Sequence, residues 1–200
     1  LPHPMSLTER RAVYQAAGLI SNVTDDAIQR VETYFDLRSN WSRAHNIAGP
    51  KAMRDPWITD FIDAVAIDQA LSDEVPLVDV GTGSGTPGLL LACLRPDHPI
   101  VLVEPIAKRT AFLRHATHAL ALKSVVTIRG HWPSTVPNHD VQVISRAVVS
   151  PQEWPQLAAS AGEQVIGILR VLAAQRPQMG LDGFYLGHAV DYVMPDESSR

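Results

Sequence analysis

Apolar residues over positions 1–75 recur with the spacing of amphipathic helices. A first helix is predicted after Ser6 and a second after Thr24, because both residues are good N-caps. Asp55 followed by Pro56 predicts the start of a third helix, since proline is favoured at the first helical position. The apolar faces of these helices are formed, in order, by Val13, Ala16, Ala17 and Ile20; by Ile28, Val31 and Phe35; and by Trp57, Phe61, Ile62 and Val65.

The pattern changes at Pro76, after which short apolar runs alternate with helical patterns. The runs occupy 77–80, 100–104, 125–128 and 141–144, and the helical patterns between them occupy 87–94 and 107–122. Apolar strands that alternate with helices are typical of a parallel sheet covered on both faces. A helix is predicted after Ser150, then a strand at 165–173 and a terminal hairpin from 183–186 and 189–193.

These elements predict an α/β fold, a Rossmann-like domain whose mostly parallel, twisted sheet carries helices on both faces. We expect residues 1–75 to form a small helical N-terminal extension packed on a core of residues 76–200. The length of 200 residues and the hydrophobic share of 46% suit one folded unit. The sequence contains neither a run of about 20 apolar residues nor a signal-peptide pattern, so we expect a cytoplasmic protein.

Few residues suggest metal or thiol chemistry. The single cysteine, Cys93, excludes an internal disulfide and argues against a zinc cluster. Because it falls in an apolar helical pattern, we expect a buried packing residue and no catalytic thiol. His115 and His118 are expected on a helix surface, with no third ligand for a metal. We also expect a monomer, because no long apolar stripe is left to face a second subunit.

A glycine loop follows the first predicted strand and leads into a helix. Its residues are Asp79-Val-Gly81-Thr-Gly83-Ser-Gly85. Glycine allows a sharp turn and a close approach of the backbone to a ligand, which a Cβ would prevent. Glu104 ends the next predicted strand, where its carboxylate is suited to accept both hydroxyls of a ribose. The order of strand, glycines, helix and acid-ended strand therefore predicts a nucleoside-containing ligand.

Two such ligands compete for this loop. Residues 83–88 fit the G-x-G-x-x-G pattern of dinucleotide sites, but Asp79 would then lie near a pyrophosphate of like charge. S-adenosyl-L-methionine carries no phosphate, and its ammonium and sulfonium groups suit a nearby carboxylate. We predict S-adenosyl-L-methionine as the ligand, with NAD and a ligand-free glycine turn as the alternatives.

Several motifs resemble one known family, the bacterial 16S rRNA guanine-N7 methyltransferases once named glucose-inhibited division protein B. They are Leu77-Val-Asp-Val-Gly-Thr-Gly-Ser-Gly-Thr-Pro-Gly-Leu-Leu-Leu-Ala92, Arg95-Pro96, Val101-Leu-Val-Glu104, Lys108-Arg109, Phe112-Leu-Arg114, Ser145-Arg-Ala147, Trp41, Asn46-Ile47 and Phe61-Ile-Asp63. Thr-Pro-Gly after the loop and Ser-Arg-Ala at a strand end are more specific than the glycines. The resemblance extends roughly from Ala27 to Ser150.

The resemblance implies a Rossmann-like methyltransferase that modifies one guanine of small-subunit ribosomal RNA, on the free RNA, a subunit or an assembly intermediate. It implies that Arg146 lies near the donor and the target base, and that Asn46 lies at the edge of the same cleft. With the loop and strand-end residues, the predicted donor site is Asp79, Gly81, Gly83, Gly85, Thr86, Glu104, His131, Trp132 and Arg146.

The chain departs from this family's pattern at three places, one of which is the family's late Lys-Gly after the fifth strand, not recognisable here. Thr59-Asp60 stands where the family usually has Arg-His, and Gly130-His-Trp-Pro133 stands where it has Gly-Arg-Ala-Glu. The second segment lies beside the adenine in relatives, so Trp132 would replace the usual contact by stacking. These changes leave two alternatives: a different acceptor (a small molecule, a protein or another RNA), or a catalytically silent RNA-binding relative.

The chemistry of guanine N7 requires little of a protein. N7 carries a lone pair and no proton, so attack on a methyl group needs no general base, and the main requirement is alignment of the reacting atoms. Arg146 is the predicted catalytic residue, because its guanidinium can hydrogen-bond guanine O6 or a phosphate.

Basic residues cluster locally although the net charge is −4. Segments 37–54 and 105–131 contain no acidic residue, and their basic residues include the predicted contacts to RNA. An ordinary solvated surface is the alternative explanation of these segments. The predicted RNA-binding residues are Arg38, Arg43, Asn46, Lys108 and Arg109.

Overall fold

The structure is a computed structural model that describes residues 6–16, 18–19, 23–49, 53–133, 140–146, 148–150, 152–160 and 165–168. The predicted strand continuation to residue 173 and the terminal hairpin lie outside these residues. The helical elements are α1 (Leu7–Ala16), α2 (Asp25–His45), the π-helical turn η1 (Trp57–Phe61), α4 (Ile62–Asp68), α5 (Gly88–Leu94), α6 (Ala107–Ala119) and α7 (Trp154–Ala159). The strands are β1 (Leu77–Val80), β2 (Ile100–Val103), β3 (Val125–Ile128), β4 (Val141–Ser145) and β5 (Val165–Ile168).

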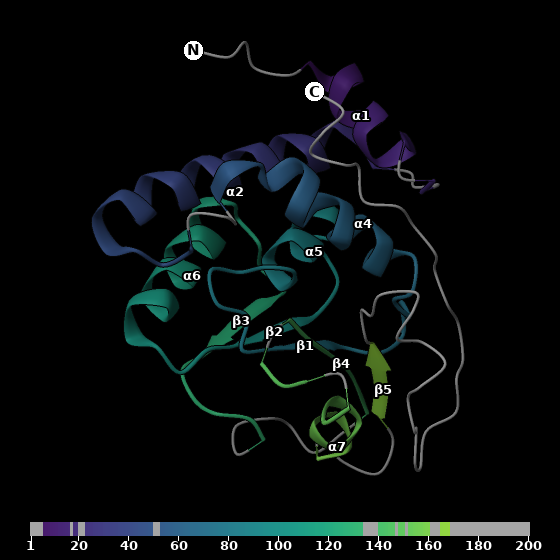
Figure 1. Cartoon of the computed structure of the whole chain (residues 1–200), viewed down its shortest axis with the longest axis vertical. Coiled ribbons are helices and arrows are strands. Elements are labelled where there is room, and N and C mark those ends of the chain that lie inside the picture. The colour runs from purple at the N-terminus through teal and green to yellow at the C-terminus, as the bar shows by residue number, and fades with distance from the viewer. Residues whose placement is uncertain are drawn as a thin grey trace.

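The five strands form one parallel sheet in the order β3-β2-β1-β4-β5, which confirms the predicted Rossmann-like α/β class. The chain moves outward from β1 first through β2 and β3 and then, on the other side, through β4 and β5. Because such crossovers are right-handed, the reversal puts α5 and α6 on one face and α7 on the other (Figure 1). The strand order therefore reverses between β1 and β4, where ligands of such sheets bind.

The cover of the sheet is less complete than predicted among the described residues. Val126 of β3 is 55% exposed and Ile166 of β5 is 46% exposed. Both strands are edges of the sheet, so the expectation of fully buried strands is wrong at these two positions. The central strands behave as predicted, since every residue of β1 is buried.

Local sequence explains where the N-terminal helices start. The Ser6 hydroxyl accepts a hydrogen bond from the Glu9 amide at 3.3 Å, while the Glu9 carboxylate accepts one from the Ser6 amide at 2.6 Å. This reciprocal pair is a capping box. The Thr24 hydroxyl caps α2 by accepting from the Ala27 amide at 3.2 Å. The predicted third helix also exists, but it opens with the π-helical turn η1 before α4 begins.

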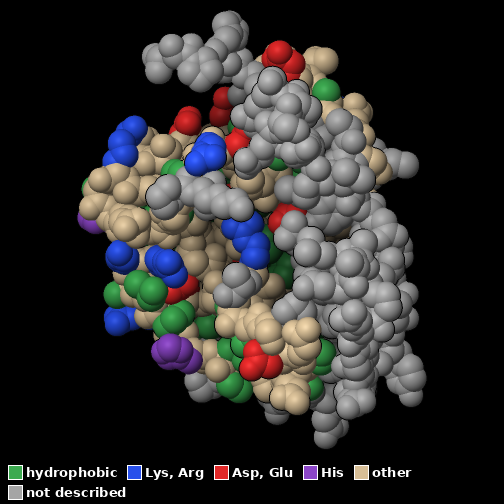
Figure 2. Space-filling model, viewed as in Figure 1, with side chains coloured by type: hydrophobic (Ala, Val, Ile, Leu, Met, Phe, Trp, Pro, Cys, Tyr) green, Lys and Arg blue, Asp and Glu red, His purple; other side chains and the backbone are tan. Residues whose placement is uncertain are grey.

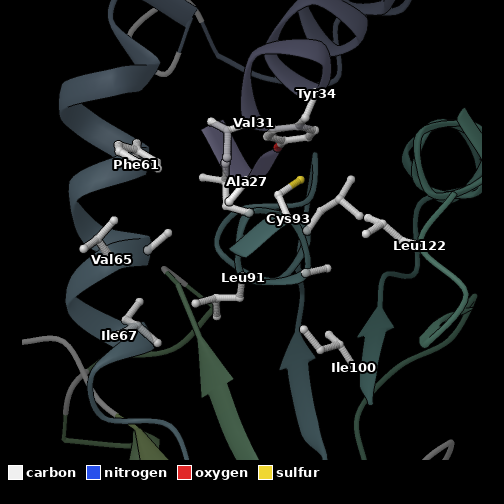
Figure 3. Close-up of a cluster of buried hydrophobic side chains, with 14 of the residues drawn as sticks. Ala27, Val31, Tyr34, Phe61, Val65, Ile67, Leu91, Cys93, Ile100 and Leu122 are labelled. Atoms are coloured by element: carbon white, nitrogen blue, oxygen red, sulfur yellow. The ribbon is translucent and has the colours of Figure 1, made fainter. Parts of the chain in front are cut away.

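Helix α2 packs against α5 and α6, and α4 packs against α5. Figure 3 shows part of the cluster of buried hydrophobic side chains that results, to which Val31 of α2, Phe61 of η1 and Leu91 of α5 all belong. The cluster therefore contains residues from both sides of position 76; the division into extension and core stays a prediction. Cys93 is fully buried there, and burial raises the pKa of its thiol to about 12, as suits a packing residue. His115 and His118 are exposed, as expected.

Within the described residues, no helix is both long and apolar enough to cross a membrane. Those residues also contain no group of three His, Cys, Asp or Glu side chains placed to hold a metal ion.

Candidate active site

The loop between β1 and α5 carries three glycines in a left-handed backbone conformation. Gly81, Gly83 and Gly85 have φ angles of +66°, +64° and +99°, which residues with a side chain rarely adopt. The amides of Gly81 and Thr82 donate hydrogen bonds of 2.9 and 3.1 Å to the carbonyl of Val103 on β2. The loop is thereby fixed to the carboxyl end of the neighbouring strand, beside the point where the strand order reverses.

A cavity of about 610 Å³ opens at the carboxyl ends of β1, β2 and β4. This volume is within the ~300–1,000 Å³ typical of small-molecule sites. Seven of the nine residues predicted to bind the donor line it, so the fold brings together segments far apart in the sequence. They are Gly81, Gly83, Thr86, Glu104, His131, Trp132 and Arg146.

Glu104 follows β2 and is held rigidly at the cavity wall. Its side chain is 2% exposed; Oε2 accepts a hydrogen bond from the Gly83 amide at 2.9 Å, and Oε1 accepts one from the Ile106 amide at 2.8 Å. A carboxylate has about four acceptor positions, so two bonds leave capacity for the hydroxyls of a guest. The glycine loop and the strand-end acid are therefore joined directly, as two parts of one site.

Asp79 lies on β1 beneath the loop and does not line the cavity. Its Oδ2 accepts a hydrogen bond from the Gly88 amide at 2.8 Å, whereas its buried Oδ1 has no hydrogen-bond partner. A Cβ at Gly88 would lie 2.6 Å from that Oδ2, which accounts for the glycine in the Thr-Pro-Gly sequence. Complete burial raises the pKa of Asp79 to about 6. The carboxyl is therefore poised to respond to a positive charge nearby.

Gly85 also points away from the cavity. A Cβ there would come within 2.9 Å of Leu89 Cβ, so this glycine allows the loop to pack closely on α5. The predicted contacts of Asp79 and Gly85 with the donor stay predictions. Because neither residue lines the cavity, each would affect donor binding through the glycine loop.

Trp132 is fixed at the far side of the cavity. Its indole Nε1 donates to the Leu157 carbonyl at 2.8 Å and to the Ser160 hydroxyl at 2.7 Å, so α7 holds the ring. His131 beside it is exposed and also lines the cavity. The segment that departs from the family pattern therefore does face the predicted donor site.

Four of the five residues predicted to bind RNA have exposed or half-exposed side chains. Arg43 and Lys108 are exposed outside the cavity, and Arg109 lines it, with its Nη1 3.9 Å from Glu104 Oε2. Asn46 is exposed and ends α2 with a left-handed φ of 44°, a conformation that asparagine tolerates. These positions leave their RNA-binding roles as predictions.

The fifth residue, Arg38, does not lie where it is predicted to lie. It was expected on the surface, yet its side chain is 1% exposed and cannot reach a phosphate backbone outside. Its Nη1 lies 2.7 Å from Asp60 Oδ2 and 3.0 Å from the Thr86 hydroxyl oxygen. Burial disfavours the charged guanidinium, but Tyr34 and Asp60 outweigh that effect and raise the pKa of Arg38.

Other cavity residues were not predicted from sequence. Val148 covers the glycine loop: its Cγ2 is 2.4 Å from where a Cβ would stand on Gly81. The signal for Val148 was its place just after Ser-Arg-Ala, and the signal for the lining segment 47–49 was its place just after Asn46. Asp60 lies behind the cavity and accepts a hydrogen bond from Arg146; in the sequence it is only a departure from the family pattern.

Comparison with known proteins gives one family. The model of a family described as rRNA small subunit methyltransferase G matches residues 27–175. A ribosomal RNA small subunit methyltransferase G of Edwardsiella ictaluri is 29% identical over 174 residues, which cover 86% of this chain and 84% of that protein. The protein of the same name from Psychromonas ingrahamii is 33% identical over 129 residues, which cover 64% of this chain and 62% of that one.

Among solved structures, precorrin-6y C5,15-methyltransferase from Geobacter metallireducens is similar over 58% of this chain and 65% of that chain, with 16% identity and a TM-score of 0.41. A likeness this low supports no argument about function.

Proposed function

Because the chain belongs to the rRNA small subunit methyltransferase G family, we propose that it transfers a methyl group from S-adenosyl-L-methionine to N7 of a guanine in small-subunit ribosomal RNA. The family match over residues 27–175 carries this proposal, because it spans the glycine loop, Glu104 and Arg146. We place the reaction in the cytoplasm, where ribosomal RNA is found in bacteria.

The residues that line the cavity, together with Asp79 beneath the glycine loop, fit this methyl donor better than a dinucleotide. Asp79 is a buried carboxyl with an unpartnered Oδ1 under the loop, so its charge favours a cationic ligand and disfavours a pyrophosphate. Gly81 and Gly83 let the backbone approach the ligand, and Glu104 is held where a ribose at the end of β2 would meet it. When bound, the donor supplies a methyl group made electrophilic by its sulfonium.

The protein's own part is then to hold and orient. Guanine N7 carries no proton, so no residue has to act as a general base. Arg146 lines the cavity on the β4 side and is 34% exposed, so its guanidinium is available to guanine O6 or to a phosphate. A hydrogen-bond donor at O6 can orient the base for this attack only if it leaves N7 uncovered.

A methyl-transfer assay tests the proposal. Purified protein is incubated with methyl-labelled S-adenosyl-L-methionine and with small subunits lacking the modification, and N7-methylguanine is mapped by chemical cleavage. One labelled guanine is the expected result. Parallel arms with free 16S rRNA, total protein and small-molecule extracts detect another acceptor. Loss of all transfer with RNA binding preserved would indicate a silent relative and contradict the proposal.

Exposed basic side chains on α2 and α6 are the surface we assign to RNA. Figure 2 shows Lys and Arg side chains gathered on the part of the molecule that carries these helices. Arg43 near the end of α2 and Lys108 near the start of α6 are both exposed. Both positions are close in the sequence to residues that line the cavity, because Ile47 follows the end of α2 and Arg109 follows Lys108.

Charge reversal of this surface is expected to impair RNA use and not donor use. The double variant Arg43→Glu/Lys108→Glu should raise the KM for the subunit about 10-fold or more at low salt, since each lost phosphate contact weakens binding. The calorimetric Kd for the donor should not change. Lys123→Glu is the control, because this exposed lysine precedes β3 and so lies toward the amino ends of the parallel strands, whereas the cavity opens at their carboxyl ends. An increase in the subunit KM for Lys123→Glu as large as that for the double variant would contradict the assignment.

A further inference from the structure

We propose that Asp60 is a positioning residue that fixes the guanidinium of Arg146 in the reaction orientation. The inference rests on the proposed methyl transfer to guanine N7. It concerns a carboxylate behind the cavity, which does not itself line it.

Asp60 forms two short ion pairs in opposite directions. It lies in the π-helical turn η1, and its side chain is 1% exposed. Its Oδ1 accepts a hydrogen bond from Arg146 Nη1 at 2.7 Å, and its Oδ2 accepts one from Arg38 Nη1 at 2.7 Å. One buried carboxylate therefore joins an arginine of the cavity to an arginine of the interior.

The interior side makes Asp60 itself immobile. Arg38 also donates to the Thr86 hydroxyl at 3.0 Å, and its guanidinium carbon lies 5.1 Å from the Phe35 ring centroid. The Tyr34 hydroxyl lies 3.1 Å from the same Thr86 oxygen and donates to the Ser84 carbonyl at 2.8 Å. Asp60 is thus anchored to α2 and to the glycine loop, so a guanidinium bonded to it is fixed relative to the donor site.

Arg146 needs such an anchor because it is long and partly solvated. It follows Ser145 at the end of β4, and the rotamer entropy of its long side chain opposes holding it in one geometry. Asp60 is its near partner, whereas Asp63 Oδ2 is 3.9 Å from Nη1. The described residues offer Nε and Nη2 of Arg146 no hydrogen bond, so these groups remain available to the acceptor.

Orientation matters at guanine in particular. Arginine commonly pairs with guanine through O6 and N7 together, and such pairing would occupy the lone pair that must attack the methyl group. With Nη1 bound to Asp60, the guanidinium is held in one orientation, and its Nε–Nη2 edge is the part left for the acceptor. A freed Arg146 would sample other orientations, including ones that cover N7, so loss of the anchor should lower kcat without raising the KM for the subunit.

The first test is the pair Asp60→Asn and Asp60→Glu, compared with Asp63→Asn at the more distant carboxylate. Asp63 is equally buried, at 2% exposure, and lies on the following turn. We expect Asp60→Asn to lower kcat roughly 10- to 100-fold, the range found for residues that orient active groups. Subunit KM should stay the same or fall, and donor Kd should change little. Asp60→Glu retains the buried charge, so it keeps the test valid if the asparagine variant does not fold.

The second test separates positioning from stability. In an Arg146→Ala background, Asp60→Asn should cost little further kcat, because the group that it positions is already gone. In the intact protein, rotation of the Arg146 Nη1 group about its bond to Cζ should be slow in ¹H–¹⁵N spectra, and Asp60→Asn should make it faster, because Nη1 is the atom bonded to Asp60. Arg146→Lys keeps the positive charge but lacks the planar guanidinium, so its kcat should stay as low as that of Arg146→Ala.

Three results would overturn the inference: wild-type kcat in both Asp60 variants, an equal kcat loss with and without Arg146, or a loss for Asp63→Asn as large as that for Asp60→Asn. The NMR readout does not depend on transfer. If the wild type transfers no methyl group yet the slow rotation of its Arg146 Nη1 group still requires Asp60, the proposed function fails while the positioning contact stands.

Discussion

Gly83→Asp is expected to abolish donor binding, with a loss in affinity of at least about 100-fold, while the protein stays folded. A Cβ at Gly83 would meet no heavy atom closer than the Gly81 carbonyl oxygen at 3.9 Å, so the new side chain fits sterically. Aspartate also tolerates the φ of +64° better than most residues. The added carboxylate would then occupy the cavity beside Glu104, whose Oε2 is 2.9 Å from the Gly83 amide.

Calorimetric titration with S-adenosyl-L-methionine and with its demethylated product measures this loss. Gly83→Asn is the matched control, because it has the same size and the same tolerance of the left-handed backbone without the charge. We expect a smaller loss for asparagine, and the difference between the two variants reports repulsion from Glu104. Full affinity in Gly83→Asp, with an unchanged melting temperature, would remove the glycine loop from the donor site.

The sequence predicts the sheet well for a physical reason. Strands in the centre of a parallel sheet are buried on both faces, so they read as unbroken apolar runs, and all four early runs match a strand within one residue. Edge strands do not obey this rule, which is why the exposure of Val126 and Ile166 was not predicted. Backbone rules that depend on one residue type, such as the Thr24 cap and the positive φ of the loop glycines, were equally readable.

Arg38 shows where such reasoning fails. Four basic residues and no acidic residue in 37–54 indicated a solvated surface. However, Val31, Tyr34 and Phe35 are buried on α2, and Arg38 continues their spacing at i, i+3, i+4 and i+7. That spacing was the available signal for burial. Its partner was not available, because Asp60 lies 22 residues away in a π-helical turn that no pattern in a single sequence indicates.

The network around Asp60 also joins residues that are far apart in the sequence, so it could be predicted only in part. A buried arginine requires a buried anion, so the position of Arg38 on the apolar face implies an acidic partner somewhere in the fold. Only the tertiary structure reveals that this partner also bonds Arg146. The Thr59-Asp60 sequence, read alone as a departure from a family pattern, is thus part of the site's own electrostatic arrangement.

Asp79→Asn is expected to stabilise the fold while weakening donor binding. Burial raises the pKa of Asp79 from 3.8 to about 6, so above pH 6 the folded state holds an ionised carboxylate that costs about 2–3 kcal/mol. Asparagine removes that charge and keeps an oxygen for the Gly88 amide. The gain in unfolding free energy should therefore appear at pH 8, together with a loss of donor affinity.

The pH dependence fixes the sign of this effect. Between about pH 4 and 6 the unfolded chain ionises Asp79 while the folded chain keeps it protonated, so wild-type stability falls as pH rises through this window. In urea unfolding, the gain in unfolding free energy from Asp79→Asn should consequently be near zero at pH 4 and constant above about pH 7. Asp36→Asn, at an exposed position of α2, should show no such growth. Wild-type donor affinity should fall below pH 6 as Asp79 protonates, whereas the donor affinity of Asp79→Asn should not. If the two proteins lose donor affinity in parallel as the pH falls, the charge of Asp79 does not act on the donor.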